Sequence, residues 1–263
     1  MLIAEIGFNF LGDINLCFKM IDLAKKNKVD AVKFQIWDTK HLVNGEWDSD
    51  GRREIYEKAQ LSSDKYIQIL NYCNNLQIIC FASTPTIRDA KNLLSISNKI
   101  IKIPSMESHN HDLIDFSLNN FEKVFVSTGA LKENELMSLT KYKDQENFYI
   151  FHCVSSYPLD LKNFNIGKFF YLKNNFKNFG YSGHYDGIDD AIFAISNGAK
   201  LIEKHFTIDK NLPGRDNKFA LLPNDFSKIK DFQNSYNKIC KLDSLDLLNE
   251  EIIVHEKYRG RWG

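Results

Sequence analysis

Two histidines in the last third of the chain have the setting of metal ligands. His184 follows the apolar run 179–181, His205 ends the run that begins at 199, and a helical pattern over 188–197 lies between them. In a parallel barrel, this order of strand, loop, helix and strand brings both imidazoles to the same carboxyl-end face. Two imidazoles with a carboxylate or water make an open site for Mn, Fe, Zn or a related ion. Four polar residues flank the pair: Ser182, Glu203, Thr207 and Asp216. The pair predicts a metal site, whereas either histidine alone is typical of an ordinary loop or core residue.

Two lysines lie in the middle of apolar runs, Lys33 in A-V-K-F-Q and Lys102 in I-I-K-I-P. A buried ammonium group is costly unless an anion or a carboxylate pairs with it. Hydroxyl groups stand at the ends of expected strands at Ser105, Ser127 and Ser182. Ammonium and hydroxyl donors together suit a phosphate or a carboxylate ligand. The alternative is a structural lysine–glutamate pair inside the barrel.

The elements that would position these residues alternate between β-type runs and amphipathic helical patterns. The expected strands are 2–6, 31–36, 77–83, 100–103, 124–127, 148–153, 179–182 and 199–205. The expected helices are 14–26, 63–76, 87–94, 113–118, 133–140, 166–171, 188–197 and 223–241, with a polar loop at 37–53. This order predicts an α/β fold, a single-domain (β/α)₈ TIM barrel over residues 1–243 followed by a C-terminal tail at 244–263. A doubly wound open sheet is disfavoured because G-F-N-F-L-G is a poor dinucleotide-binding fingerprint.

Composition narrows the class of protein. The chain has 263 residues, of which 43% are hydrophobic and 26% charged, which is enough apolar material for a packed core. Lysine plus arginine equals aspartate plus glutamate at 34 each, so no global positive charge points to nucleic acid. There is no apolar run long enough to cross a membrane and no secretion signal at the amino terminus. The five cysteines are scattered, which is typical of reduced residues in a cytoplasmic protein.

Eight short motifs fall in an order that resembles the sialic acid synthase family, over nearly the whole chain. They are E-I-G-F-N at Glu5, K-F-Q at Lys33, S-T-P at Thr84, K-I-P-S-M-E at Lys102, V-S-T-G at Ser127, H-C-V-S-S-Y-P at His152, G-Y-S-G-H at His184 and E-K-H-F-T at His205. The resemblance implies a (β/α)₈ enzyme that condenses phosphoenolpyruvate with an N-acyl hexosamine. N-acetylmannosamine or a related bacterial amino sugar would be the acceptor, and the products would be phosphate and a nine-carbon 2-keto acid.

The resemblance also implies roles for individual residues. Those that would hold phosphoenolpyruvate are Lys33, Thr84, Lys102, Ser105, Ser127 and Ser182. Those that would face the sugar are Gln35, Glu107, Tyr157 and Asp216. His184 and His205 would bind a divalent ion, Mn²⁺ first and Mg²⁺ or Co²⁺ as alternatives, and Glu5 would help to activate water.

The sequence departs from the family pattern at several positions. Phe10 stands where the family has histidine, Gly183 where it has an acidic residue, and Pro104 and Met106 where it has small residues. Because these positions surround the sugar or the metal, they bear on the identity of the acceptor more than on the reaction.

The family usually carries a small antifreeze-like domain whose arginine reaches the sugar pocket of the partner in a homodimer, and that domain is not in this sequence. The basic and aromatic tail offers Arg259 or Arg261 as a substitute. Two other functions remain open. One is the synthesis of another keto sugar acid from a phosphorylated aldose, for which Arg52, Arg53 and Arg215 could bind the second phosphate; the other is sugar binding by a degenerate, non-catalytic paralogue.

Overall fold

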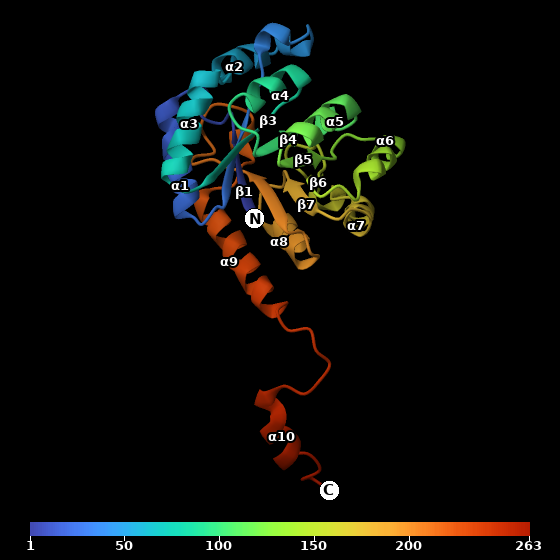
Figure 1. The fold of residues 1–263 in the computed structure, drawn as a ribbon. Coiled ribbons are helices and arrows are strands. Elements are labelled where there is room, and N and C mark those ends of the chain that lie inside the picture. Colours follow the sequence, from blue (N-terminus) through green and yellow to red (C-terminus); the bar gives the residue numbers. More distant parts are fainter.

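Eight parallel strands close into a barrel in chain order, from β1 round to β8, and helices cover its outside (Figure 1). The structure is a computed structural model and describes residues 1–263. The strands are β1 (Leu2–Gly7), β2 (Ala31–Gln35), β3 (Ile79–Ser83), β4 (Ile100–Ile103), β5 (Lys123–Ser127), β6 (Phe148–His152), β7 (Phe179–Gly183) and β8 (Leu201–His205). The helices are α1 (Ile14–Lys26), α2 (Arg52–Ala59), α3 (Ser63–Asn75), α4 (Ile87–Leu94), α5 (His111–Asn120), α6 (Glu133–Ser138), α7 (Ile166–Asn175), α8 (Asp189–Ser196), α9 (Pro223–Ile239) and α10 (Ile252–Lys257). The predicted (β/α)₈ barrel is confirmed.

Helix starts follow from residues that can satisfy free backbone amides. The side chains of Asp13, Ser62, Thr86 and Asn110 accept hydrogen bonds from amides in the first turns of α1, α3, α4 and α5. Helix α9 begins with Pro223, whose missing amide costs nothing at that position. These caps place each helix directly after the strand and loop that precede it.

The inside of the barrel has an apolar layer and a polar layer. Inward-facing residues recur at every second position of a strand. Some of them form a buried apolar cluster: Ile3, Ala31, Phe81, Phe125 and Phe151. Two residues further along their strands stand Glu5, Lys33 and Ser127. The polar side chains therefore gather toward the carboxyl ends of the strands, above an apolar plug.

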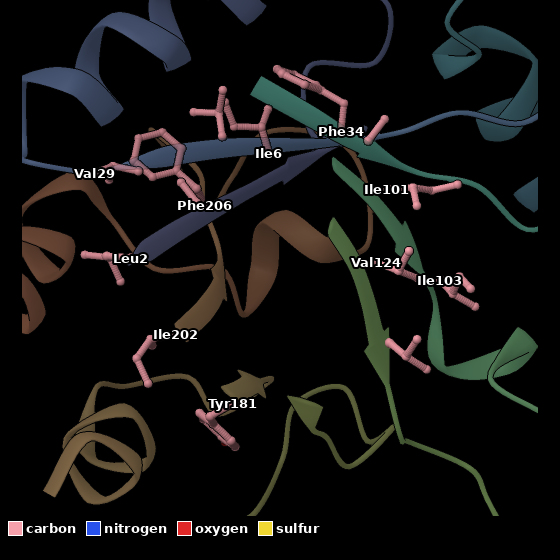
Figure 2. Close-up of a cluster of buried hydrophobic side chains, with 14 of the residues drawn as sticks. Leu2, Ile6, Val29, Phe34, Ile101, Ile103, Val124, Tyr181, Ile202 and Phe206 are labelled. Carbon is pink, nitrogen blue, oxygen red and sulfur yellow. The ribbon is translucent and has the colours of Figure 1, made fainter. Parts of the chain in front are cut away.

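A second and larger core separates the outside of the sheet from the helices (Figure 2). Side chains such as Ile6, Phe34, Ile101 and Phe206 belong to it and are buried almost completely. Because both faces of every strand are covered, the strands read as nearly continuous apolar runs. None of the helices has the length and hydrophobicity that a membrane span requires.

The segment between β2 and α3 is more structured than the predicted polar loop. It contains two 3₁₀ turns and helix α2, which begins at Arg52, inside the predicted loop. The rings of Phe8, Trp37 and Tyr56 meet edge to face, with centroids 5.6 to 6.4 Å apart, and anchor the segment to the barrel. Aromatic packing across distant positions, which local polarity does not reveal, orders this stretch.

The chain leaves the barrel after α9. Residues 237–263 are exposed, and α10 lies apart from the barrel (Figure 1).

Candidate active site

A layer of four buried charges occupies the interior of the barrel. Lys33 Nζ lies 2.7 Å from Glu5 Oε2 and 3.7 Å from Glu203 Oε1, and Lys102 Nζ lies 3.0 Å from Glu203 Oε2. The two lysines thus share Glu203, which stands between them. Lys102 Nζ also lies 3.8 Å from the centre of the Phe151 ring, at the top of the apolar plug.

Each charge has a pKa shaped by burial and by its partners. Burial opposes ionisation of Glu203, but Lys102 and Lys33 outweigh it and lower its pKa to about 2. Burial also lowers the pKa of Lys102, whereas Glu203 and Glu5 outweigh burial at Lys33 and raise its pKa. The pKa of Glu5 is raised, chiefly by burial, although Lys33 opposes the shift. Glu203 is therefore the firmly ionised carboxylate, and Glu5 is the more basic of the two.

Both interpretations of the buried lysines have structural support. The structural lysine–glutamate pairs are present, as the alternative required. Each ammonium group nevertheless carries three donors, and hydroxyl groups without partners also point into the buried region. Thr84 Oγ1 and Ser127 Oγ are buried and make no hydrogen bond, which is costly unless a ligand satisfies them. An anion that accepts from the hydroxyls and ammonium groups would resolve that cost.

The other two serines of the predicted anion site are partly engaged. Ser182 Oγ donates to Glu203 Oε1 over 3.0 Å. Ser105 Oγ accepts from the backbone amide of Gly129 over 3.0 Å and lies 3.4 Å from Cys153 Sγ. A Cβ atom at position 129 would clash with the hydroxyls of Ser105 and Ser155, so any side chain there would displace them. The ends of β4, β5 and β6 thus form a polar cradle.

The two histidines lie side by side at the carboxyl ends of β7 and β8, with ring centroids 5.4 Å apart. His184 Nδ1 donates to the carbonyl of Val154 over 2.8 Å, which leaves Nε2 with a free lone pair. His205 Nδ1 is buried without a hydrogen bond, and the nearest carboxylate oxygen, Asp216 Oδ2, is 3.5 Å away. A free imidazole nitrogen on each ring is what a metal ion needs.

Protonation and ligand number set limits on that metal site. Burial and the neighbouring His184 hold the pKa of His205 well below its usual value, so this imidazole is neutral. At His184 burial acts in the same direction, but Cys153 and the Val154 carbonyl outweigh it and raise the pKa, so protons would compete with a metal there. No three His, Cys, Asp or Glu side chains converge as a ready metal cage. The residues fit a two-histidine site that water or substrate oxygens complete.

Three of the four residues predicted to face the sugar lie beside Glu5 or the histidines. Gln35 Nε2 donates to Glu5 Oε1 over 2.6 Å. The ring of Tyr157 packs on His184 with centroids 4.2 Å apart, and Asp216 faces His205. Burial raises the pKa of Asp216 to about 6. Glu107 lies apart from this group and lines an open pocket with Pro85, Thr86, Ile87, Arg88 and Asn110.

The backbone at β1 permits the close approach of Glu5 and Gln35. Gly7 has a φ of +55°, and the register between β1 and β2 shifts between Glu5 and Gly7. A Cβ atom at Gly7 would stand 3.0 Å from both Gln35 Nε2 and Glu5 Oε1. Glycine is needed here because the left-handed backbone and the crowded carboxylate leave little room for a side chain.

A buried ion pair outside the barrel holds the loop of His184. Lys204 Nζ lies 2.6 Å from Asp190 Oδ2 and donates to the carbonyl of Tyr185 over 2.8 Å. The hydroxyl of Tyr181 donates to the same carboxylate over 2.7 Å. A Cβ atom at Gly183 would clash with Asp190 and Tyr181. Glycine at this position, where the family has an acidic residue, therefore leaves room for the Asp190 carboxylate from α8.

Sequence reasoning noted Glu203 beside the histidines but gave it no role. The alternation along β8 was the available signal, because Glu203 and His205 point to the same side and Lys204 to the other. The predicted role of the basic tail residues concerns the sugar pocket of a partner subunit. Arg261 stacks on Tyr258 and Trp262, and the tail lies away from the barrel (Figure 1). The role of Arg259 or Arg261 in the sugar pocket of a partner subunit therefore stays a prediction.

The chain is similar in sequence and in fold to several known proteins. The sequence profile of the NeuB family matches residues 20–242. A pseudaminic acid synthase of Campylobacter jejuni is 30% identical over 244 residues, which cover 87% of this chain and 70% of that protein. An N-acetylneuraminate-9-phosphate synthase of Drosophila melanogaster is 31% identical over 267 residues, covering 96% and 71%. The crystal structure of an N-acetylneuraminic acid synthetase from Leptospira borgpetersenii, in complex with citrate, superposes with a TM-score of 0.88 at 28% identity and covers 98% of this chain and 92% of that chain.

Proposed function

The chain belongs to the NeuB family, and on that premise we propose that it condenses phosphoenolpyruvate with an N-acyl hexosamine. The products would be phosphate and a sialic-acid-like nonulosonate. The relatives named above make different acids of this kind, so the family supports the reaction class while leaving the acceptor open. All five cysteines are free thiols, which supports a cytoplasmic setting where phosphoenolpyruvate is available.

The observation that carries the proposal is the meeting of two sets of groups at one end of the barrel. Lys33 and Lys102, with the unsatisfied hydroxyls of Thr84 and Ser127, offer donors for a phosphate and a carboxylate. The imidazole pair stands at the ends of the adjoining strands β7 and β8, and Glu5 pairs in register with His205 across the β1–β8 junction. Both substrates would therefore meet beside Glu5.

The chemistry follows from these positions. The ammonium groups and hydroxyls would hold phosphoenolpyruvate and exclude water from its charged ends. A divalent ion on His184 and His205 would polarise the aldehyde oxygen of the sugar. Carbon 3 of phosphoenolpyruvate would form a bond to the aldehyde carbon as the carbonyl π bond opens, and water oriented by Glu5 would add to carbon 2. The proton that this water loses would balance the one that the sugar oxygen gains as it becomes a hydroxyl. The bond between carbon 2 and the phosphate oxygen would then break and release phosphate.

Glu5 suits the task of taking the proton from that water. Burial raises its pKa, while Lys33 and Gln35 fix both of its oxygens within hydrogen-bonding distance. A base works best when its pKa lies near the operating pH and its orientation is fixed. We therefore assign water activation to Glu5 and sugar contact to Gln35, Tyr157, Asp216 and Glu107.

For the metal, Mn²⁺ is the ion we propose, with Mg²⁺ or Co²⁺ as alternatives. Two nitrogen ligands favour a transition metal over Mg²⁺, which prefers oxygen. The free lone pair on His184 Nε2 and the unpartnered Nδ1 of His205 support this assignment.

The phosphorylated-aldose alternative has less support. Arg52 pairs with Asp50 at 2.6 Å and Arg53 pairs with Asp48, so both guanidinium groups are engaged by carboxylates that directly precede α2. Arg215 is exposed and stays a candidate for a second phosphate. A role that is limited to binding a neutral sugar is disfavoured, because the buried lysines and unsatisfied hydroxyls suit an anion that such a protein would not need.

The test is a phosphate-release assay with phosphoenolpyruvate and a panel of N-acyl hexosamines, each free and 6-phosphorylated, with Mn²⁺ or with a chelator. We expect release with at least one free N-acyl sugar, loss of release with the chelator, and loss in Lys102→Met. Release only with phosphorylated sugars that lack an N-acyl group would favour the alternative synthase. No release with any sugar, although phosphoenolpyruvate binds, would favour the non-catalytic role.

A further inference from the structure

One half-buried lysine near the polar cradle has no carboxylate partner. Lys168, in the first turn of α7, directs Nζ at the carboxyl ends of β5 and β6, where it donates to the carbonyl of Thr128 and, over 3.3 Å, to the carbonyl of Cys153. None of the ion pairs of the chain includes it, and burial lowers its pKa. A cation that gives up water without a counter-ion has an energetic cost that an anion nearby would offset.

The two carbonyls that Lys168 holds belong to the backbone of the cradle. In a trans peptide the carbonyl oxygen and the amide hydrogen point in opposite directions. With the Thr128 oxygen turned outward to Lys168, the Gly129 amide points the other way, where it meets Ser105 Oγ at 3.0 Å. The same geometry turns the Val154 amide away from Lys168 when the Cys153 carbonyl faces it. One ammonium group therefore sets the direction of two backbone donors.

The side of the strands opposite Lys168 is already built for an anion. Ser127 Oγ is buried there without a hydrogen bond. The hydroxyls of Ser105 and Ser155 converge on Gly129 so closely that a Cβ atom would displace them. Lys168 stands directly behind this cradle and adds a positive charge to the field within it.

We propose that Lys168 is a positioning residue for the anionic end of phosphoenolpyruvate, acting through the peptide groups 128–129 and 153–154 and through its charge. This inference rests on the proposed function, because it assumes that phosphoenolpyruvate is the anion in the cradle. It assigns no contact between Lys168 and the acceptor sugar or the histidines.

The experiment is calorimetric titration of phosphoenolpyruvate into the chain in chelator, so that no metal contributes, with steady-state kinetics alongside. Lys168→Met keeps the length of the side chain and removes its charge. We expect its Kd for phosphoenolpyruvate to rise roughly fivefold to tenfold, the size expected for a single charge acting across a strand. Its KM for the acceptor should stay within about twofold of the wild type, a split that a general loss of structure would not give.

Three further variants separate the parts of the proposal. Lys173→Met, an exposed position on the same helix, is the matched control and should bind like the wild type. Lys168→Arg keeps the charge and should retain most of the affinity. Lys168→Gln keeps a neutral donor for the carbonyls, and binding between that of the wild type and the Met variant would mean that both orientation and charge contribute. If the Met variant does not fold, the Gln and Arg variants give the same comparison.

The results that would overturn the proposed function differ from those that would overturn the role of Lys168. A wild-type chain that does not bind phosphoenolpyruvate would overturn the proposed function itself. Wild-type binding that neither the neutral variants nor the Arg variant alters would overturn the role of Lys168 and leave the proposed function standing. A parallel loss of affinity for phosphoenolpyruvate and acceptor, with a lowered melting temperature, would mark Lys168 as a structural support only.

Discussion

Replacing Glu203 by glutamine should destabilise the chain and at the same time favour the anion. Glu203 lies between two buried ammonium groups, 3.0 Å from Lys102 and 3.7 Å from Lys33. Its pKa falls from the ordinary 4.5 to about 2, a difference worth about 3 kcal/mol of folding stability. Removing one partner of a buried ion pair costs a similar amount, about 3–5 kcal/mol, because the other charge is left unpaired.

The charge count gives the second half of the prediction. With both glutamates ionised the four buried groups sum to zero, and in the glutamine variant they sum to +1. Phosphoenolpyruvate would then take the place of the missing carboxylate. The stabilisation that a saturating concentration of it produces should be larger in the variant than in the wild type, since the ligand also relieves the unpaired lysines.

Urea unfolding with and without phosphoenolpyruvate, in chelator, measures both effects. Glu122→Gln is the matched control, because Glu122 pairs with Lys99 at the surface, where such a pair is worth about 0–1 kcal/mol. A loss of stability in Glu203→Gln no greater than in the control would contradict the account of the buried charges. Equal ligand stabilisation in wild type and variant would refute the idea that carboxylate and substrate compete for the same lysines.

Three more outcomes are expected. Burial lowers the pKa of His152 from 6.5 to about 4, so between these values the unfolded chain binds a proton that the folded chain does not. The free energy of unfolding should therefore be full above about pH 6.5 and fall by up to about 3 kcal/mol toward pH 4. Urea titrations of the wild type and of His152→Asn should give stabilities that converge as the pH is lowered. Asp190→Asn leaves Lys204 buried without its carboxylate and should cost about 3–5 kcal/mol in the same assay, while an unchanged midpoint would mean that the pair is neutral to folding. Gly129→Ala pushes the cradle apart and should raise the KM for phosphoenolpyruvate at least about tenfold at unchanged melting temperature, an effect that steady-state kinetics would detect or exclude.

Much of the fold could be predicted from the sequence because the strands and the helices of the barrel have different sequence patterns. Strands covered on both faces give apolar runs, and the loops between them carry the caps that begin helices, as at Asp13 and Ser62. A lysine inside an apolar run, as at Lys33 or Lys102, stands out because it can be there only with a partner. The segment 37–60 was less readable because its order comes from packing between Phe8, Trp37 and Tyr56.

The residues of the site also fall into a predictable group and an unpredictable one. Residues on strands could be predicted, because parallel strands deliver their carboxyl ends to one rim and alternation tells which side chains point inward. Lys168 and Asp190 could not, since each lies on a helix and reaches the site through backbone groups or through another side chain. Their charges look like ordinary helix surface in the sequence. Only the distances between elements reveal that they support the strand ends.

The closure of the barrel has a consequence for how the chain folds. Strand β1 pairs with β8 in register from Leu2 with Ile202 to Glu5 with His205, so the last seam joins the first and last strands of the barrel, which are far apart in the chain. Contacts of such long range form late and slowly. Since Glu5 and His205 lie on opposite sides of that seam, a barrel in which β1 and β8 are not yet paired lacks a complete site. The rate at which activity recovers during refolding would therefore report the rate at which these two strands pair.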